Sequence, residues 1–226
     1  MATKKTGWLI LFFAASAIEI MANLMAWDAV HLFAKPLIML SLIAHYYVHS
    51  PVRSMLFVGA LFFCWAGDVL LIFQAKNGLF FIGGLVAFLI GHVIYILCYR
   101  QLMIADRSKE LLGTQKVRFS LPIILAGSGL VVVLYPVLGD LRVPVMVYAL
   151  VLTLMALNAL FRFGRTNTAS FALIFSGAIC FMISDSALAI NKFLQPFSGA
   201  GVLIMFTYCL AQYLIVAGAL AHEREL

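Results

Sequence analysis

Charged residues are scarce in this chain, and their scarcity excludes an ordinary soluble domain. Lys, Arg, Asp and Glu make up 11% of the 226 residues, whereas 65% are hydrophobic and the mean hydropathy is +1.08. About a quarter of a soluble domain is charged. Because a membrane helix needs about 20 apolar residues, a chain of this length holds roughly eight of them. We therefore predict an all-α polytopic membrane protein, with one transmembrane domain over residues 1–226.

Cysteine is also rare, and its placement excludes two further classes. The chain has four cysteines, at positions 64, 98, 180 and 209, each within an apolar run and without Cys-x-x-Cys spacing. A disulfide framework or a metal knuckle is therefore not expected, and we predict ordinary buried thiols. The formal net charge of +6 is assigned to loops at the cytoplasmic membrane face. Nucleic acid is for that reason not an expected partner.

Apolar runs predict eight membrane spans. They are placed at about 7–27, 33–49, 54–73, 79–99, 119–137, 143–162, 169–190 and 199–221. Eleven Lys and Arg residues fall on the side of the termini and four on the other, so both termini are predicted to be cytoplasmic. The longest connector, 100–118, is expected to be a solvated face that attracts anionic lipid. We expect an integral protein of a bacterial inner (plasma) membrane.

One of the apolar runs contains an acid. Asp68 lies within residues 62–72, which are otherwise apolar, and a carboxylate in hydrocarbon is unfavourable unless it is paired, hydrated or protonated. Asp185 is a second such acid, within residues 181–188. The two acids are 117 residues and four spans apart in similar local sequences. This similarity is compatible with a parallel repeat of four plus four helices.

Counting residues from the nearest flanking charge gives the depth of each polar side chain. At the helical rise, Asp68, Asp185 and Glu19 lie about 12, 10 and 13 Å from the non-cytoplasmic end. Other polar residues predicted for the same half of the membrane are Lys35, Tyr148, Asn23, Asn191 and, somewhat deeper, Tyr208. We call these residues the carboxylate layer. Because each span reaches this depth independently, their agreement points to a common role.

The histidines are predicted to lie outside the carboxylate layer. His45 and His49 are one helical turn apart, a spacing that suits a metal pair, but at the cytoplasmic end of their span an interfacial polar turn is the commoner role. His92 is also placed nearer the cytoplasm, His31 in a loop and His222 in the tail. This arrangement argues against a zinc–water hydrolase with three histidine ligands, and no metal is expected.

Two carboxylates at one depth have several uses. Like charges in a low-dielectric pocket titrate separately, so one acid can donate a proton while the other accepts one, which permits hydrolysis without a metal. The same pair could carry protons or cations through a transporter. Either Asp could instead be a structural cap or a salt-bridge partner of Lys35, and Glu19 could merely orient Lys35 or a tyrosine. A lipid-binding protein without turnover is a third interpretation.

Short motifs recur in a characteristic order over most of the chain. They are Lys35-Pro36; Gly67-Asp68 with Leu71; Phe81, Gly84, Phe88 and Gly91-His92 with Tyr95; Gly177-Ala178, Phe181 and Ser184-Asp185; Asn191-Lys192-Phe193; and Tyr208 with Gln212. Their order and spacing resemble the YhhN-like lysoplasmalogenases, which are eight-span membrane proteins. Gly83-Gly84 and Gly91 are expected to permit close helix packing.

The resemblance implies a reaction and a set of site residues. A lysoplasmalogenase cleaves the vinyl ether bond of a lysoplasmalogen to a fatty aldehyde and glycerophosphoethanolamine or glycerophosphocholine. Asp68 and Asp185 would be the catalytic acid and base, in unassigned order, without a metal or redox cofactor. The partners are then a lysophospholipid substrate and the surrounding membrane lipid. The substrate-binding residues expected on this basis, near the headgroup phosphate, the glycerol or the water, are Lys35, Asn191, Lys192, Tyr208, Gln212 and His92, together with Glu19 and Tyr148 from the carboxylate layer.

Overall fold

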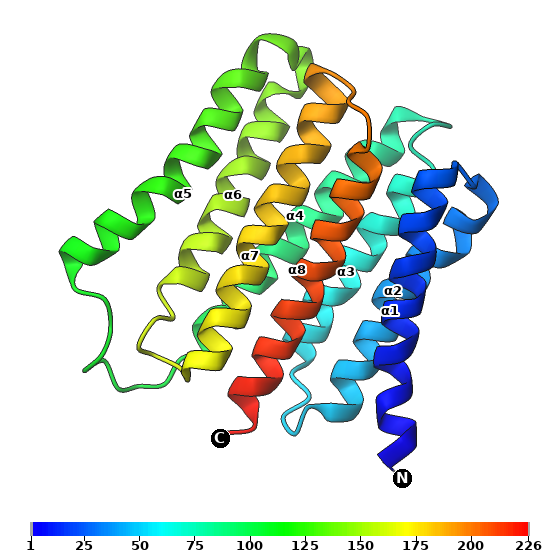
Figure 1. Ribbon diagram of the computed structural model, residues 1–226. Helices are drawn as coiled ribbons and strands as arrows, with labels where there is room; N and C mark the ends of the chain where they lie inside the picture. Colours follow the sequence, from blue (N-terminus) through cyan, green and yellow to red (C-terminus); the bar gives the residue numbers. More distant parts are fainter. Residues whose placement is uncertain (1, 226) are drawn as a thin grey trace. The chain divides into compact units, whose positions relative to one another are not determined.

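The computed structural model describes residues 2–225 and, of these, the side chains of residues 7–27 and 29–225. Residues 2–225 form α-helices joined by turns and loops, with no strand among them (Figure 1). The helices are α1 (Ala2–Met25), α2 (Asp28–His49), α3 (Met55–Ile72), α4 (Gly78–Gln101), α5 (Gly113–Leu134), α6 (Arg142–Leu160), α7 (Thr168–Ala189) and α8 (Ala200–Glu223). Each of these eight is long and apolar enough to cross a membrane. The predicted all-α, eight-helix membrane architecture is confirmed.

Three helices begin five or six residues earlier than their predicted spans. α1 begins at Ala2, α2 at Asp28 and α5 at Gly113, whereas the spans were predicted from 7, 33 and 119. The apolar run ends where polar residues begin, but a helix continues as long as its backbone hydrogen bonds do. At α5 the Gln115 side chain accepts a hydrogen bond from the Leu112 N–H at 2.9 Å, which supports this polar first turn. One consequence is that His31 lies on α2 and not in a loop.

The helices form two compact units, Met1–Tyr95 and Ile96–Leu226, with the boundary inside α4. In the first unit α1 lies along α2, and α2 packs on α3 (Figure 1). The contact of α3 with α4 depends on glycine. A Cβ atom at Gly84 would lie 2.9 Å from the Leu71 side chain, and one at Gly91 would lie 3.0 Å from Cys64 Sγ. The expected close packing is confirmed at these two glycines but not at Gly83, where a Cβ atom would lie 3.5 Å from the Leu70 side chain, an ordinary contact. The four-plus-four repeat stays a prediction.

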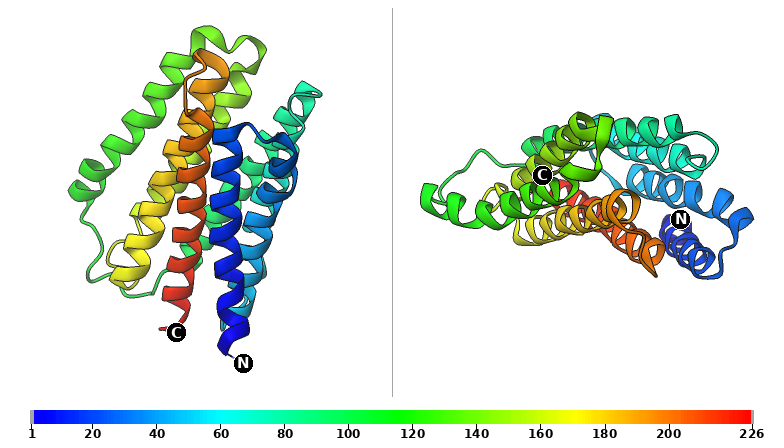
Figure 2. Two further views of the ribbon diagram at one scale, coloured as in Figure 1. Left: turned by 45° about the vertical axis from the view of Figure 1, so that its right-hand side comes forward. Right: turned by 90° about the horizontal axis from the view of Figure 1, so that it is seen from above.

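In the second unit α7 and α8 lie side by side along their length (Figure 2). Two serines of α7 donate across the contact: Ser170 Oγ to the Gly218 carbonyl at 2.7 Å and Ser184 Oγ to the Ile204 carbonyl at 3.0 Å. Small residues and cross-helix hydroxyl bonds are the usual means by which membrane helices pack closely. These bonds fix the rotation of α7 about its axis, and so the direction in which Asp185, next to Ser184, can point.

The connector between α4 and α5 is held at its start by the turn between α6 and α7. The Ile104 N–H donates to the Arg165 carbonyl at 2.7 Å, and Arg165 Nη2 donates to the Ile104 carbonyl at 2.8 Å. Residues 104–109 remain exposed, as the sequence predicts for a solvated face. Their attraction to anionic lipid stays a prediction.

Gly164, in the turn between α6 and α7, makes this connection possible. Its φ is +70°, and a Cβ atom there would overlap the Lys109 carbonyl oxygen. We expect Gly164→Ala to lower the free energy of unfolding by more than about 2 kcal/mol, because it adds a steric clash to the strain of a positive φ. Gly139→Ala is the matched control, since Gly139 has a φ of +52° with open space around it. Thermal unfolding in detergent that shows equal losses for both variants would contradict the role of the Lys109 contact.

Candidate functional site

Four helices of the first unit each contribute one buried polar side chain predicted for the site. Glu19 on α1 and His92 on α4 are fully buried, Asp68 on α3 is 2% exposed, and Lys35 on α2 is 9% exposed. Buried ionisable groups within membrane helices are rare and mark functional sites by default. These four side chains are therefore buried, as the sequence placed them within helices, and their role in a site stays a prediction.

Glu19 is paired with a histidine. Its Oε1 atom lies 2.5 Å from His31 Nδ1, and Asn23 Nδ2 donates to the same oxygen at 3.2 Å. The prediction that the histidines lie outside the carboxylate layer is thus wrong for His31. The prediction failed because α2 begins earlier than expected, which places His31 on the first turn of a helix that packs along α1. Glu19 is oriented by His31 and Asn23.

The remaining histidines of this unit have contacts within their own helices. His92 stacks on Phe88, one turn earlier on α4, with ring centres 6.4 Å apart. The rings of His45 and His49 are 4.2 Å apart, and His49 Nδ1 donates to the His45 carbonyl at 2.9 Å. That hydrogen bond favours the polar-turn interpretation of the pair. Among the residues described, no group of three or more His, Cys, Asp or Glu side chains is arranged to hold a metal ion.

The second unit holds the other predicted acid in a specific hydrogen bond. Tyr148 on α6 donates from its hydroxyl to Asp185 Oδ2 on α7 at 2.5 Å. Tyr148 is buried, and Asp185 is partly buried. Charge-assisted O–H···O⁻ bonds have lengths of about 2.5–2.7 Å, shorter than bonds between neutral groups. The sequence had placed both residues in one layer, and the structure brings them into direct contact.

Helix α8 lines the same unit with two of the predicted residues. Tyr208 is buried, with its ring edge-on to Phe181 at a centre-to-centre distance of 5.5 Å. Phe181 is one turn before Asp185 on α7, so Tyr208 contacts the helix segment that carries the acid. Gln212 is fully buried one turn further along α8. Tyr208 and Gln212 therefore share a face of α8 that is closed to bulk water.

α7 is extended by a π-helical turn, Ile190–Leu194, which the sequence did not predict. The Gln195 N–H donates to the Ile190 carbonyl at 3.0 Å, and Asn191 Oδ1 accepts from the Phe197 N–H at 3.2 Å. Asn191 thus supports the loop that leads to α8, while the Lys192 side chain is exposed. Single π turns within helices occur frequently at functional sites.

Comparison with known proteins identifies the family. The sequence profile described as the YhhN family matches residues 30–219. The chain belongs to the YhhN family. The match includes Lys35, Asp68, His92 and Asp185 but not Glu19. The family resemblance predicted from the short motifs is thereby confirmed.

Named relatives of this YhhN-family chain cover different shares of it. Lysoplasmalogenase of Mycobacterium tuberculosis is 33% identical over 140 residues, 61% of this chain and 50% of the relative. Human lysoplasmalogenase TMEM86B is 31% identical over 198 residues, which are 87% of this chain and 77% of the relative. Human lysoplasmalogenase TMEM86A is 32% identical over 189 residues, which are 80% of this chain and 72% of the relative. The chain spans about half the length of the mycobacterial relatives it matches. No solved structure matches significantly.

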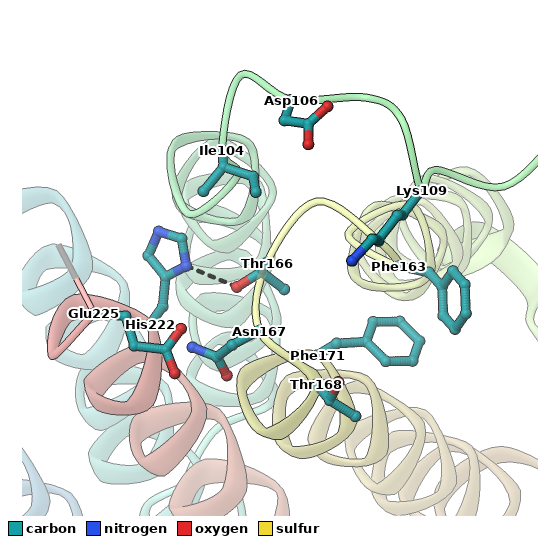
Figure 3. A pocket seen from close by; sticks show the side chains of 11 residues that line it. Ile104, Asp106, Lys109, Phe163, Thr166, Asn167, Thr168, Phe171, His222 and Glu225 are labelled. Atoms are coloured by element: carbon teal, nitrogen blue, oxygen red, sulfur yellow. Dashed lines mark hydrogen bonds between the residues drawn. The ribbon is translucent and has the colours of Figure 1, made fainter.

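A separate pocket of 590 Å³ lies at the other end of α7 of this YhhN-family chain (Figure 3). Thr166 and His222 meet at its wall, with Thr166 Oγ1 2.7 Å from His222 Nδ1. The placement of His222 in the tail is therefore wrong, because α8 continues past the apolar run to Glu223. Asn167, also in the wall, uses its amide to cap α7 and to bond the Ala221 carbonyl at 3.0 Å. These polar groups hold α7 against α8, and Phe171 in the wall is about 21 Å along α7 from Asp185.

Proposed function

We propose that the chain hydrolyses the vinyl ether bond of a lysoplasmalogen. The observation that carries the proposal is its similarity to the two human proteins named lysoplasmalogenase, over 72% or more of their length. The chemistry has a physical counterpart in the two units, because each holds a carboxylate on a membrane helix, Asp68 on α3 and Asp185 on α7. The substrate is an amphiphile whose tail stays in hydrocarbon, so a site within the membrane suits it.

The proposed reaction begins with proton transfer to carbon. One Asp, in its neutral form, donates a proton to the outer alkene carbon, and the electrons of the double bond form the new C–H bond. The carbon attached to oxygen becomes an oxocarbenium ion, which the second Asp, ionised, stabilises. Water adds to this carbon and gives its proton to the ionised Asp, which yields a hemiacetal.

Collapse of the hemiacetal restores both acids. The first Asp, now ionised, takes the hydroxyl proton as the C=O bond of the aldehyde forms. The second Asp, now neutral, gives its proton to the glycerol oxygen as the C–O bond breaks. The products are a fatty aldehyde and a glycerophospho-headgroup compound. Among the other proposed contacts, Lys35 and Lys192 carry the positive charge that would attract the headgroup phosphate, and Tyr208, Gln212 and His92 would orient water or glycerol.

Aldehyde release tests this function. Purified protein in detergent or in liposomes is expected to release aldehyde from a lysoplasmalogen, whereas the matched 1-O-alkyl lysophospholipid, which lacks the double bond to protonate, is expected to remain intact. Turnover is expected to persist in excess chelator; a loss that zinc restores would overturn the metal-free mechanism. Absence of aldehyde release in both media would contradict the hydrolase. A flux of protons or cations across the same liposomes, driven by an ion gradient, would instead support the transporter.

A further inference from the structure

The hydrogen bond between Tyr148 and Asp185 joins two helices whose relative register is held by packing. Val145, one turn before Tyr148 on α6, is buried in an apolar cluster with Leu134 and Leu138. Ala189, one turn after Asp185 on α7, and Phe193 of the π turn pack against the same cluster. The cluster therefore lies beside the hydrogen bond, on the side where α6 begins and α7 ends.

This packing leaves the Tyr148 hydroxyl little freedom. Burial of the ring fixes the side chain, since a tyrosine has only two side-chain torsions to lose, and the cluster fixes the helix that carries it. The hydroxyl donates to one carboxylate oxygen of Asp185 at 2.5 Å. Such a donor stabilises the ionised carboxylate and fixes the plane of its second oxygen.

We infer that Tyr148 is a positioning residue that holds Asp185 as the ionised partner of the reaction, which leaves Asp68 as the proton donor. The inference rests on the proposed function and assigns roles that the sequence left open. Asp185 stabilises the oxocarbenium ion and takes the proton from water. Asp68 takes the role of proton donor because the proposed reaction needs one neutral acid beside the ionised one. Tyr148 itself transfers no proton.

Replacement of the hydroxyl tests this role. Tyr148→Phe keeps the ring and is expected to lower kcat about 10- to 100-fold, the loss of one hydrogen bond to a charged group, while KM changes less than about twofold. Tyr135→Phe is the matched control, because Tyr135 is exposed in the turn before α6 and is expected to keep full activity. Equal thermal stability of the two variants would show that the fold is intact.

A graded change separates positioning from mere packing. Fluorinated tyrosines at position 148 are nearly isosteric but donate more strongly, so log kcat is expected to change in order with phenol acidity. If the wild type turns over and neither Tyr148→Phe nor the fluorotyrosines alter kcat, the inference is wrong and the hydrolase stands.

Infrared spectra near neutral pH test the protonation states of the two acids independently of turnover. Asp185→Asn should remove a carboxylate band and Asp68→Asn a protonated-carboxyl band, and the reverse pattern would overturn the assignment.

Discussion

Replacing Asp68 by Asn is expected to lower the rate of aldehyde release about 10²- to 10⁴-fold, the usual contribution of a general acid or base. Asn has nearly the shape of Asp but cannot supply a proton to the alkene carbon. Asp185→Asn is expected to cause a loss of similar size, because an amide neither stabilises the oxocarbenium ion by charge nor accepts a proton from water. The measurement is kcat for lysoplasmalogen cleavage by purified protein of matched thermal stability.

The control for these variants is Asp140→Asn. Asp140 is exposed in the short turn between α5 and α6, so the same chemical change there should leave the rate unaltered. Because the two acids are proposed to act as one unit, the double variant should lose little more than the slower single variant. Full activity in both single variants would disprove the two-acid mechanism even if the chain proves to be a hydrolase.

Arg162→Met is expected to lower the free energy of unfolding by about 3 kcal/mol, because several acceptors lose a charged hydrogen-bond donor. Arg162 follows α6 and is fully buried. Its Nη2 atom donates to Ser170 Oγ at 2.7 Å and to the Leu102 carbonyl at 3.1 Å, so one guanidinium joins α7 to the α4–α5 connector. Met fills similar volume but leaves these acceptors without their donor.

Burial lowers the pKa of Arg162 to about 10, which leaves the side chain charged at neutral pH. The charged guanidinium is therefore available as a hydrogen-bond donor to its buried acceptors. Arg162→Lys separates the charge from the guanidinium geometry: it keeps the charge but lacks the planar fork that reaches two acceptors, and should recover less than half of the loss. Arg118→Met, at an exposed position, controls for net charge. Wild-type stability of Arg162→Lys in thermal unfolding would show that the guanidinium geometry is unimportant.

The sequence-based prediction misplaced two histidines because it used hydropathy to place the ends of helices. His31 and His222 were assigned to a loop and a tail because the apolar runs end before they are reached. Both lie on helices, α2 and α8, whose backbone hydrogen bonds continue into polar sequence. Arg162 was counted only as a cytoplasmic charge, since nothing in its local sequence distinguishes an exposed arginine from a buried one. The π turn at Ile190–Leu194 likewise has no composition of its own.

By itself, the sequence determined the number and type of helices, the close packing at Gly84 and Gly91, the presence of Asp68 and Asp185 within membrane helices, and the family. These follow from hydropathy, residue size and motif order, which are local properties. Only the tertiary structure decided that Tyr148 donates to Asp185 from 37 residues away, that His31 pairs with Glu19, and that Arg162 joins α7 to a connector. The physical reason is that such pairs depend on helix rotation and register. These are set by contacts such as Ser184 with the Ile204 carbonyl and the Val145 cluster.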